Sequence, residues 1–124
     1  MADEKAYEKG LEVRRTLWGE AGVERLKNYE EVDKELARLI VEYPFGNVWG
    51  RPGLDLKSRS MCTVAVLTAL ARGPELAIHI KGALNQGITQ KEVLEILIHV
   101  GVYAGLPTTV EAIRVAKEVF KENS

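Results

Sequence analysis

The chain has 124 residues, of which 46% are apolar, so its length and composition suit one compact domain over residues 1–124. Charged residues make up 28% of the chain and nearly cancel to a net charge of −1, which disfavours nucleic acids and membrane surfaces as partners. The sequence has neither a secretory signal nor an apolar run long enough to cross a membrane, so we expect a soluble, cytoplasmic protein.

Apolar residues recur at spacings of three and four almost throughout, which predicts an all-α fold. The first amphipathic helix is expected over residues 4–18, and a short helical segment around residues 23–29 follows it. The next helix is marked by an apolar stripe of Val32, Leu36, Leu39, Ile40 and Tyr43. We expect Pro44 to end this helix, because proline disfavours the helical conformation of the residue before it.

Residues 44–55 are rich in proline and glycine, which predicts a loop, yet they also contain Phe45 and Trp49. We expect these two rings to fasten the loop onto the rest of the protein. Asp55 is a candidate N-cap for the following helix, which runs to about residue 72 and is apolar on nearly every side. A helix of this kind is expected at the centre of the core, covered all round.

Glycine and proline mark the boundaries of the next helix. Gly73 is expected to close the central helix, and Pro74 fits the first turn of a helix that Gly87 ends.

Two T-x-x-E motifs predict the starts of the last two helices. Thr89 and Glu92 have the spacing of a capping box, so a helix is expected from residue 90 to Gly105. Thr108 and Glu111 repeat this spacing and are expected to open the last helix.

Glu75 and His79 lie four residues apart in a predicted helix, so they share one of its faces. A carboxylate beside an imidazole stabilises the imidazolium and orients it, as a general acid working near neutral pH requires. Both residues are therefore candidate catalytic groups. The alternative is a half-buried histidine that is hydrogen-bonded to Glu75 for structural reasons only.

Three arginines that precede this pair in the sequence could together hold a small dianion. Arg72 lies just before the helix that carries His79, and Arg51 and Arg59 lie within and just after the predicted loop. Arginine suits carboxylates because its planar fork makes two parallel hydrogen bonds. The alternative for each arginine is an ordinary solvated surface residue.

The chain's other histidine, His99, has Glu95 one turn before it and Tyr103 one turn after it, among apolar neighbours. We expect a mainly structural role, with lining of the site from a second helix as the alternative.

Cys62 is the only cysteine, so no disulfide and no C-x-x-C pair can form within the chain. Burial in the apolar helix would raise the pKa of its thiol and leave it inert. The sequence contains no metal-ligand set and no nucleotide-binding motif.

Three motifs follow one another along the chain: W-x-R-P-G-L-D at residues 49–55, E-L-x-x-H-x-x-x-A-L-N-x-G at residues 75–87, and G-I-T-x-x-E-V-x-E at residues 87–95. With the earlier segment Y-E-K-G-L-E-V-R-R-T-L-W-G-E-A-G-V-E-R, they resemble the gamma-carboxymuconolactone decarboxylase family over about residues 7–120. The resemblance implies a single domain with the alkylhydroperoxidase D-like helical fold, assembled into a homo-oligomer that is usually a hexamer.

The resemblance also implies an activity. Family members of this kind convert 4-carboxymuconolactone, a lactone with two carboxylates, to the enol-lactone of 3-oxoadipate without a cofactor. Loss of CO₂ requires stabilisation of the developing oxyanion and delivery of one proton to carbon. His79, oriented by Glu75, is the expected proton donor. The expected substrate-binding residues are Arg51, Arg72, Arg59 and Trp49, the last of which would help to keep water out.

Two other functions remain as alternatives. A second branch of the superfamily runs thiol redox chemistry through C-x-x-C-x-x-x-H, but the window here reads R-G-P-E-L-A-I-H, with Arg72 and Glu75 at the two cysteine positions. This difference disfavours the second hypothesis, a peroxidase or disulfide reductase acting through Cys62. The third hypothesis is a non-catalytic oligomeric binding protein. Oligomerisation also has support from the residues, because the predicted helices carry more apolar surface than one small bundle readily buries.

Overall fold

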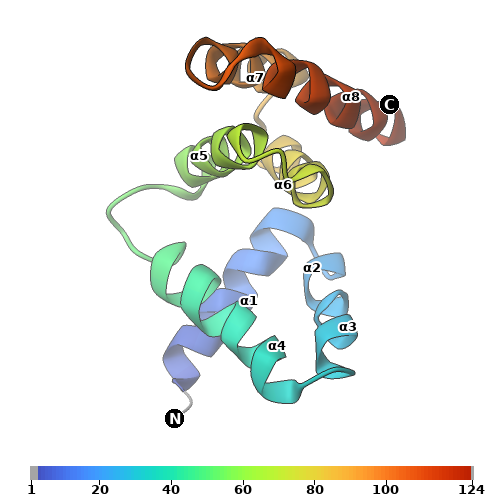
Figure 1. The fold of residues 1–124 in the computed structure, drawn as a ribbon. Coiled ribbons are helices and arrows are strands. Elements are labelled where there is room, and N and C mark those ends of the chain that lie inside the picture. Colours follow the sequence, from blue (N-terminus) through green and yellow to red (C-terminus); the bar gives the residue numbers. More distant parts are fainter. Residues whose placement is uncertain (1–2, 124) are drawn as a thin grey trace. The chain divides into compact units, whose positions relative to one another are not determined.

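The computed structural model describes residues 3–123, and every regular element within them is a helix (Figure 1). The prediction of an all-α fold is therefore confirmed. The chain divides into two compact units, Met1–Asp55 and Leu56–Ser124, and each is described by itself. That residues 1–124 form one domain stays a prediction. None of the helices in residues 3–123 has the length and apolar character that crossing a lipid bilayer requires.

The first unit contains, in chain order, α1 (Glu4–Trp18), α2 (Ala21–Glu24), α3 (Leu26–Glu30), α4 (Lys34–Ile40) and the π-helix η1 (Val41–Val48). The helix predicted over residues 4–18 is confirmed, and the segment expected around residues 23–29 is two short helices. α1 packs closely on η1 through Gly10 and Gly46. A Cβ atom at either glycine would overlap a backbone carbonyl oxygen of the opposite helix, so both positions require glycine's small size.

Pro44 does not end the helix, which contradicts the sequence prediction. The α-helix changes at Val41 into a π-helix that contains Pro44 and continues to Val48. The Trp49 N–H donates to the Pro44 carbonyl, five residues back, at 2.8 Å. In an α-helix the proline ring clashes with the carbonyl four residues earlier, and the wider π-turn relieves that clash.

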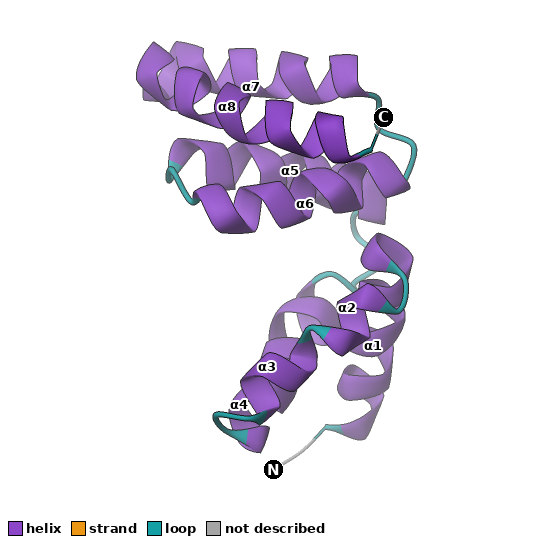
Figure 2. Ribbon diagram, turned by 90° about the vertical axis from the view of Figure 1, so that its right-hand side faces the viewer, coloured by secondary structure: helices purple, strands orange, loops and turns teal. Residues whose placement is uncertain are grey.

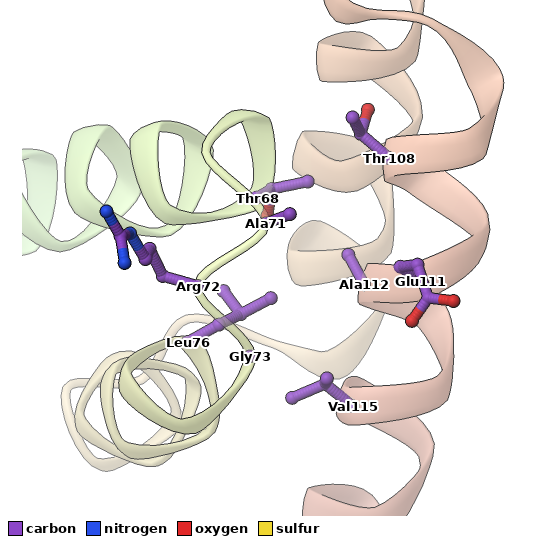
Figure 3. A pocket seen from close by; sticks show the side chains of 9 residues that line it. All are labelled: Thr68, Ala71, Arg72, Gly73, Leu76, Thr108, Glu111, Ala112 and Val115. Atoms are coloured by element: carbon purple, nitrogen blue, oxygen red, sulfur yellow. The ribbon is translucent and has the colours of Figure 1, made fainter.

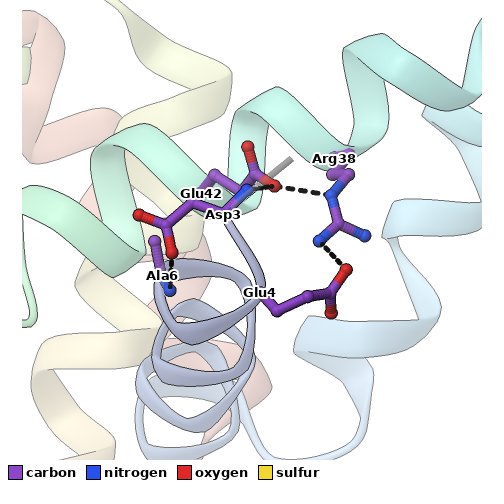
Figure 4. Close-up of polar contacts among 5 residues, drawn as sticks. All are labelled: Asp3, Glu4, Ala6, Arg38 and Glu42. Carbon is purple, nitrogen blue, oxygen red and sulfur yellow. Dashed lines mark hydrogen bonds and ion pairs between the residues drawn. The ribbon is translucent and has the colours of Figure 1, made fainter. Parts of the chain in front are cut away.

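Side chains tie the start of α1 to α4 and η1 (Figure 4). Asp3 caps α1 by accepting a hydrogen bond from the Ala6 N–H at 3.0 Å, and its own N–H donates to Glu42 Oε1 at 3.1 Å. The guanidinium of Arg38 donates to Glu42 at 2.5 Å and to Glu4 at 2.6 Å. These contacts join the first turn of α1 to Arg38 of α4 and Glu42 of η1.

Most of the apolar stripe predicted for residues 32–43 is exposed, although the helix itself is present. The exposed members of the stripe are Val32, Leu36, Leu39 and Tyr43. The unit instead buries Ala37 and Val41, because these positions face the other helices of the unit. Phe45 and Trp49 are also buried, which confirms that they fasten this segment to the unit.

The second unit contains α5 (Leu56–Ala69), α6 (Gly73–Asn85), α7 (Gln90–Ala104) and α8 (Leu106–Glu122). α5 lies beside α6 and α7 lies beside α8, so the four helices form two layers (Figure 2). The buried core of this unit consists of Val64, Leu76, Ile80, Ala83, Ile88, Val93, Leu97, Ala112, Ala116 and Val119.

The prediction that the helix after Asp55 is covered all round is wrong for α5. It buries only the side of Ser60, Val64 and Thr68, while Val66 is 54% exposed and Leu70, directly after the helix, is 61% exposed. Cys62 is exposed as well, so the expected burial of its thiol is also wrong. The cause is that the other helices of the unit cover one side of α5.

α5 and α6 both end in Schellman motifs. After α6, Gly87 has a φ of 89°, and its N–H donates to Leu84 at 3.0 Å, which confirms that Gly87 ends this helix. After α5, the left-handed residue is Ala71 with a φ of 57°, and the Arg72 N–H donates to Leu67 at 3.0 Å. Gly73 was expected to close α5, but it is the first residue of α6.

The capping box that opens α7 is confirmed, whereas the one predicted for α8 is not formed. The Glu92 N–H donates to Thr89 Oγ1 at 3.0 Å, and the Thr89 N–H donates to Glu92 Oε1 at 2.9 Å. α7 ends at Gly105, as expected. α8 begins at Leu106, before Thr108, because Pro107 fits the first helical turn.

Candidate functional site

Helix α6 carries the two candidate catalytic residues, and one candidate arginine directly precedes it. Arg72 is the exposed residue just before the helix, and Glu75 is exposed in its first turn, where a negative charge favours the helix dipole. His79 is half-buried one turn later. The neighbouring Leu76 and Ile80 are 2% and 0% exposed, so the imidazole lies at the border of the core.

A small cavity lies beside Arg72, between the α5–α6 turn and α8 (Figure 3). Its volume is about 60 Å³, well below the roughly 300 Å³ at which typical small-molecule sites begin. The guanidinium of Arg72 points away from Thr108 and Glu111, which line the other side. Glu111 pairs with Arg114. This cavity is therefore too small to hold a dicarboxylate lactone.

Arg59 is half-buried on α5. Its carbonyl accepts a hydrogen bond from Thr63 Oγ1 at 2.8 Å, so its backbone position is fixed within the helix.

In the first unit, Trp49 is 8% exposed and stacks on Phe45, with ring centroids 5.9 Å apart and planes inclined by 27°. Arg51 follows two residues later and is exposed, and its N–H donates to the Val48 carbonyl at 3.1 Å. A rigid buried ring thus precedes an exposed guanidinium by two residues.

Arg14 and Arg25, which are not among the site residues predicted from the sequence, are the two arginines of an aromatic cluster in this unit. Arg14 is 5% exposed, with its Cζ 5.0 Å from the Trp18 ring centroid and 4.9 Å from that of Phe45. The Cζ of Arg25 lies 4.7 Å from the Trp18 centroid. Burial, followed by the nearby charge of Arg25, lowers the pKa of Arg14 to about 10, and burial lowers the pKa of Arg25. The available sequence signal was the four-residue spacing from Arg14 to Trp18 and from Arg25 to Tyr29.

An open groove of about 480 Å³ on the second unit is lined by Cys62 of α5 and by Glu95 and His99 of α7. The rings of His99 and Tyr103 lie 5.6 Å apart and are tilted against each other. Within residues 3–123, no three His, Cys, Asp or Glu side chains are placed to hold one metal ion.

The structure places Glu75 and His79 one turn apart on α6, directly after Arg72, and it places Trp49 and Arg51 in the same short segment of the first unit. The roles of these residues and of Arg59 stay predictions.

The chain is similar to several known proteins. It is 42% identical to "4-carboxymuconolactone decarboxylase" of Acinetobacter baylyi over 98% of this chain and 92% of that protein. It is 34% identical to "Nitrosuccinic acid decarboxylase npaB" of Metarhizium robertsii over 95% of this chain and 83% of that protein. The sequence profile of the carboxymuconolactone decarboxylase family matches residues 34–118, and the chain therefore belongs to this family.

Proposed function

We propose that the protein is a cofactor-free decarboxylase of a small lactone dicarboxylate such as 4-carboxymuconolactone. The observation that carries this proposal is the 42% identity, over nearly the full length of both chains, to a protein named for that reaction. The fungal relative is named as a decarboxylase of another small acid, which supports carboxy-lyase chemistry independently of the lactone.

In the proposed reaction the C–C bond to one carboxylate breaks and CO₂ leaves. The electron pair passes through the ring double bond to the lactone carbonyl, and one proton is then added to carbon. His79 donates this proton as imidazolium and recovers one from solvent, and Glu75 orients the ring. This role is supported by the half-buried position of His79 one turn after Glu75. A positioned general acid typically contributes about 10²- to 10⁴-fold in rate.

Substrate binding is assigned to Arg51, Arg72 and Arg59, which would hold the carboxylates, and to Trp49, which would help to exclude water. The exposure of Arg51 and Arg72 leaves their guanidinium groups accessible, and bidentate pairing with a carboxylate is the contact that arginine makes best. We also propose that the protein assembles into a homohexamer and is located in the cytoplasm.

The test is turnover of 4-carboxymuconolactone, measured as lactone consumed and CO₂ released. His79→Ala is expected to lower kcat by about 10²- to 10⁴-fold. Lys91→Ala, which removes an exposed side chain in the first turn of α7, serves as the control and should stay near wild type. If the wild type decarboxylates nitrosuccinate but not the lactone, the named substrate is wrong. If it decarboxylates neither, the proposed function fails.

The alternative function is a thiol-dependent peroxidase or disulfide reductase. It is retained because Cys62 is exposed, so its thiol is accessible to a substrate. The chain has one cysteine, so a two-thiol relay within one chain is not possible. Loss of a peroxide-reducing activity in Cys62→Ser, with lactone turnover absent in the wild type, would favour this alternative.

A further inference from the structure

The first unit holds two guanidinium groups against one indole ring. The Cζ atoms of Arg14 and Arg25 lie 5.0 and 4.7 Å from the centroid of Trp18. Arg14 also lies 4.9 Å from the Phe45 centroid, so aromatic rings contact it from two sides. Two like charges are therefore close together in a largely apolar surrounding.

Neither guanidinium is neutralised by a carboxylate among the described residues. Three acidic side chains near them in sequence are engaged elsewhere, since Glu12 pairs with Lys9 at 3.6 Å, Glu20 with Arg15 at 3.2 Å and Glu24 with Lys27 at 3.0 Å. Burying charge without a counter-charge destabilises a protein unless something else compensates.

Arg25 lacks a hydrogen-bond acceptor for one of its nitrogens, just as it lacks a counter-charge. Arg14 Nε donates to the Gly22 carbonyl at 2.7 Å, which gives Arg14 a structural role in joining α1 to α2. Arg25 Nη2, in contrast, is buried and has no hydrogen-bond partner among residues 3–123. A buried charged donor without an acceptor in the chain is rare in folded proteins, and ordered water, an ion or a ligand group supplies the acceptor in such cases.

We propose that Arg25, supported by Arg14, is a carboxylate-binding site, and that it takes one carboxylate of the dicarboxylate substrate. This inference rests on the proposed function. Arg25 as a whole is only partly buried, so a carboxylate can approach its guanidinium from solvent, and contact with the enclosed Nη2 requires a small shift of the side chain. The indole of Trp18 stabilises the cation by a cation–π contact, and the surrounding rings lower the local dielectric, which strengthens the ion pair.

The cluster is continuous with a residue of the expected substrate site. The Phe45 ring that contacts Arg14 also stacks on Trp49, 5.9 Å away. Arg14, Phe45 and Trp49 therefore form one packed series within the first unit. A carboxylate held at Arg25 would be bound by groups whose positions this packing fixes.

The experiment compares wild type with Arg25→Gln, Arg25→Lys and the matched control Arg15→Gln. Two quantities are measured: the Kd for succinate, a dicarboxylate without a lactone carbonyl, by calorimetry, and kcat and KM for 4-carboxymuconolactone. Arg25→Gln is expected to raise Kd and KM by about 10- to 100-fold, because a hydrogen bond to a charged group is lost. Arg25→Lys should recover part of the binding, since it keeps the charge without the planar fork. Arg15→Gln should match wild type, because Arg15 is exposed and pairs with Glu20.

The two measurements separate this inference from the proposed function. Normal lactone turnover with unchanged Kd and KM in Arg25→Gln would overturn the inference and leave the decarboxylase intact. Succinate binding that Arg25→Gln weakens, without lactone turnover by the wild type, would support the site and overturn the proposed substrate. A wild type that neither binds succinate nor turns over the lactone overturns both. If Arg25→Gln does not fold, as judged by circular dichroism, Arg25→Lys decides by the same measurements.

Discussion

Ala71 stands out among the described non-glycine residues, because it alone has a left-handed backbone, with a φ of 57°. The Cβ atom makes this conformation about 1 kcal/mol less favourable for alanine than for glycine. Ala71→Gly is therefore expected to raise the Tm by about 3 to 6 °C, measured by thermal denaturation. Ala69→Gly, in the last turn of α5, is the control and should lower the Tm, because glycine weakens a helix. A Tm of Ala71→Gly at or below the wild-type value would contradict the argument.

Sequence spacing predicts those site residues whose neighbours are local. The separation of Glu75 and His79 by one turn follows from their position in a single helix, and α6 has it. The spacing from Arg14 to Trp18 indicates one contact of Arg14, but its burial also depends on Phe45, which is distant in sequence and outside any local pattern. The exposure of Cys62 has a similar origin, since an apolar helix is buried only where other elements cover it.

Close packing of α1 on η1 depends on glycine at the point of contact. A Cβ at Gly46 would overlap the Ala6 carbonyl oxygen, and a backbone atom cannot move aside as a flexible side chain can. Gly46→Ala is expected to lower the free energy of unfolding by about 1 to 3 kcal/mol, measured by urea denaturation. In Gly53→Ala, the control, the new Cβ meets nothing within 4 Å, and the change should stay within about 0.5 kcal/mol. Equal urea midpoints for the two variants would refute this account of the contact.

Helix boundaries were predictable where one signal acted alone. Thr89 and Glu92 cap α7 as expected, because no competing start lies nearby. Thr108 does not mark the start of α8. The fixed φ of Pro107 suits the first helical turn, so the helix starts at Leu106, two residues before Thr108. The predicted helix end at Pro44 is wrong because proline disrupts α-helical turns, whereas Pro44 lies in a π-helix. The sequence contains no signal for this change of helix type.

At the scale of the whole molecule, the family assignment and the division into units concern different properties of the chain. The matching family profile covers residues 34–118 and so includes parts of both units. Two compact units are compatible with a single family domain. The family profile describes the order of residues along the chain, whereas the two units are defined by which residues pack together in space.

A group of exposed apolar residues at the α7–α8 turn supports self-association of the whole molecule. Val102, Tyr103 and Leu106 are 71%, 83% and 68% exposed, and removing such area from water stabilises an interface. Light scattering coupled to size exclusion is therefore expected to give a multiple of the chain mass for the wild type. Val102→Lys should lower that mass, because it places a charge within the apolar group.

The matched control for this prediction is Glu118→Lys, an exposed position on α8. It changes the charge more than Val102→Lys does but removes no apolar area, so it should keep the wild-type mass. Circular dichroism must first show that both variants keep their helices. A monomeric wild type would refute self-association, whereas equal loss of mass in both variants would indicate that charge, and not apolar burial at the α7–α8 turn, controls assembly.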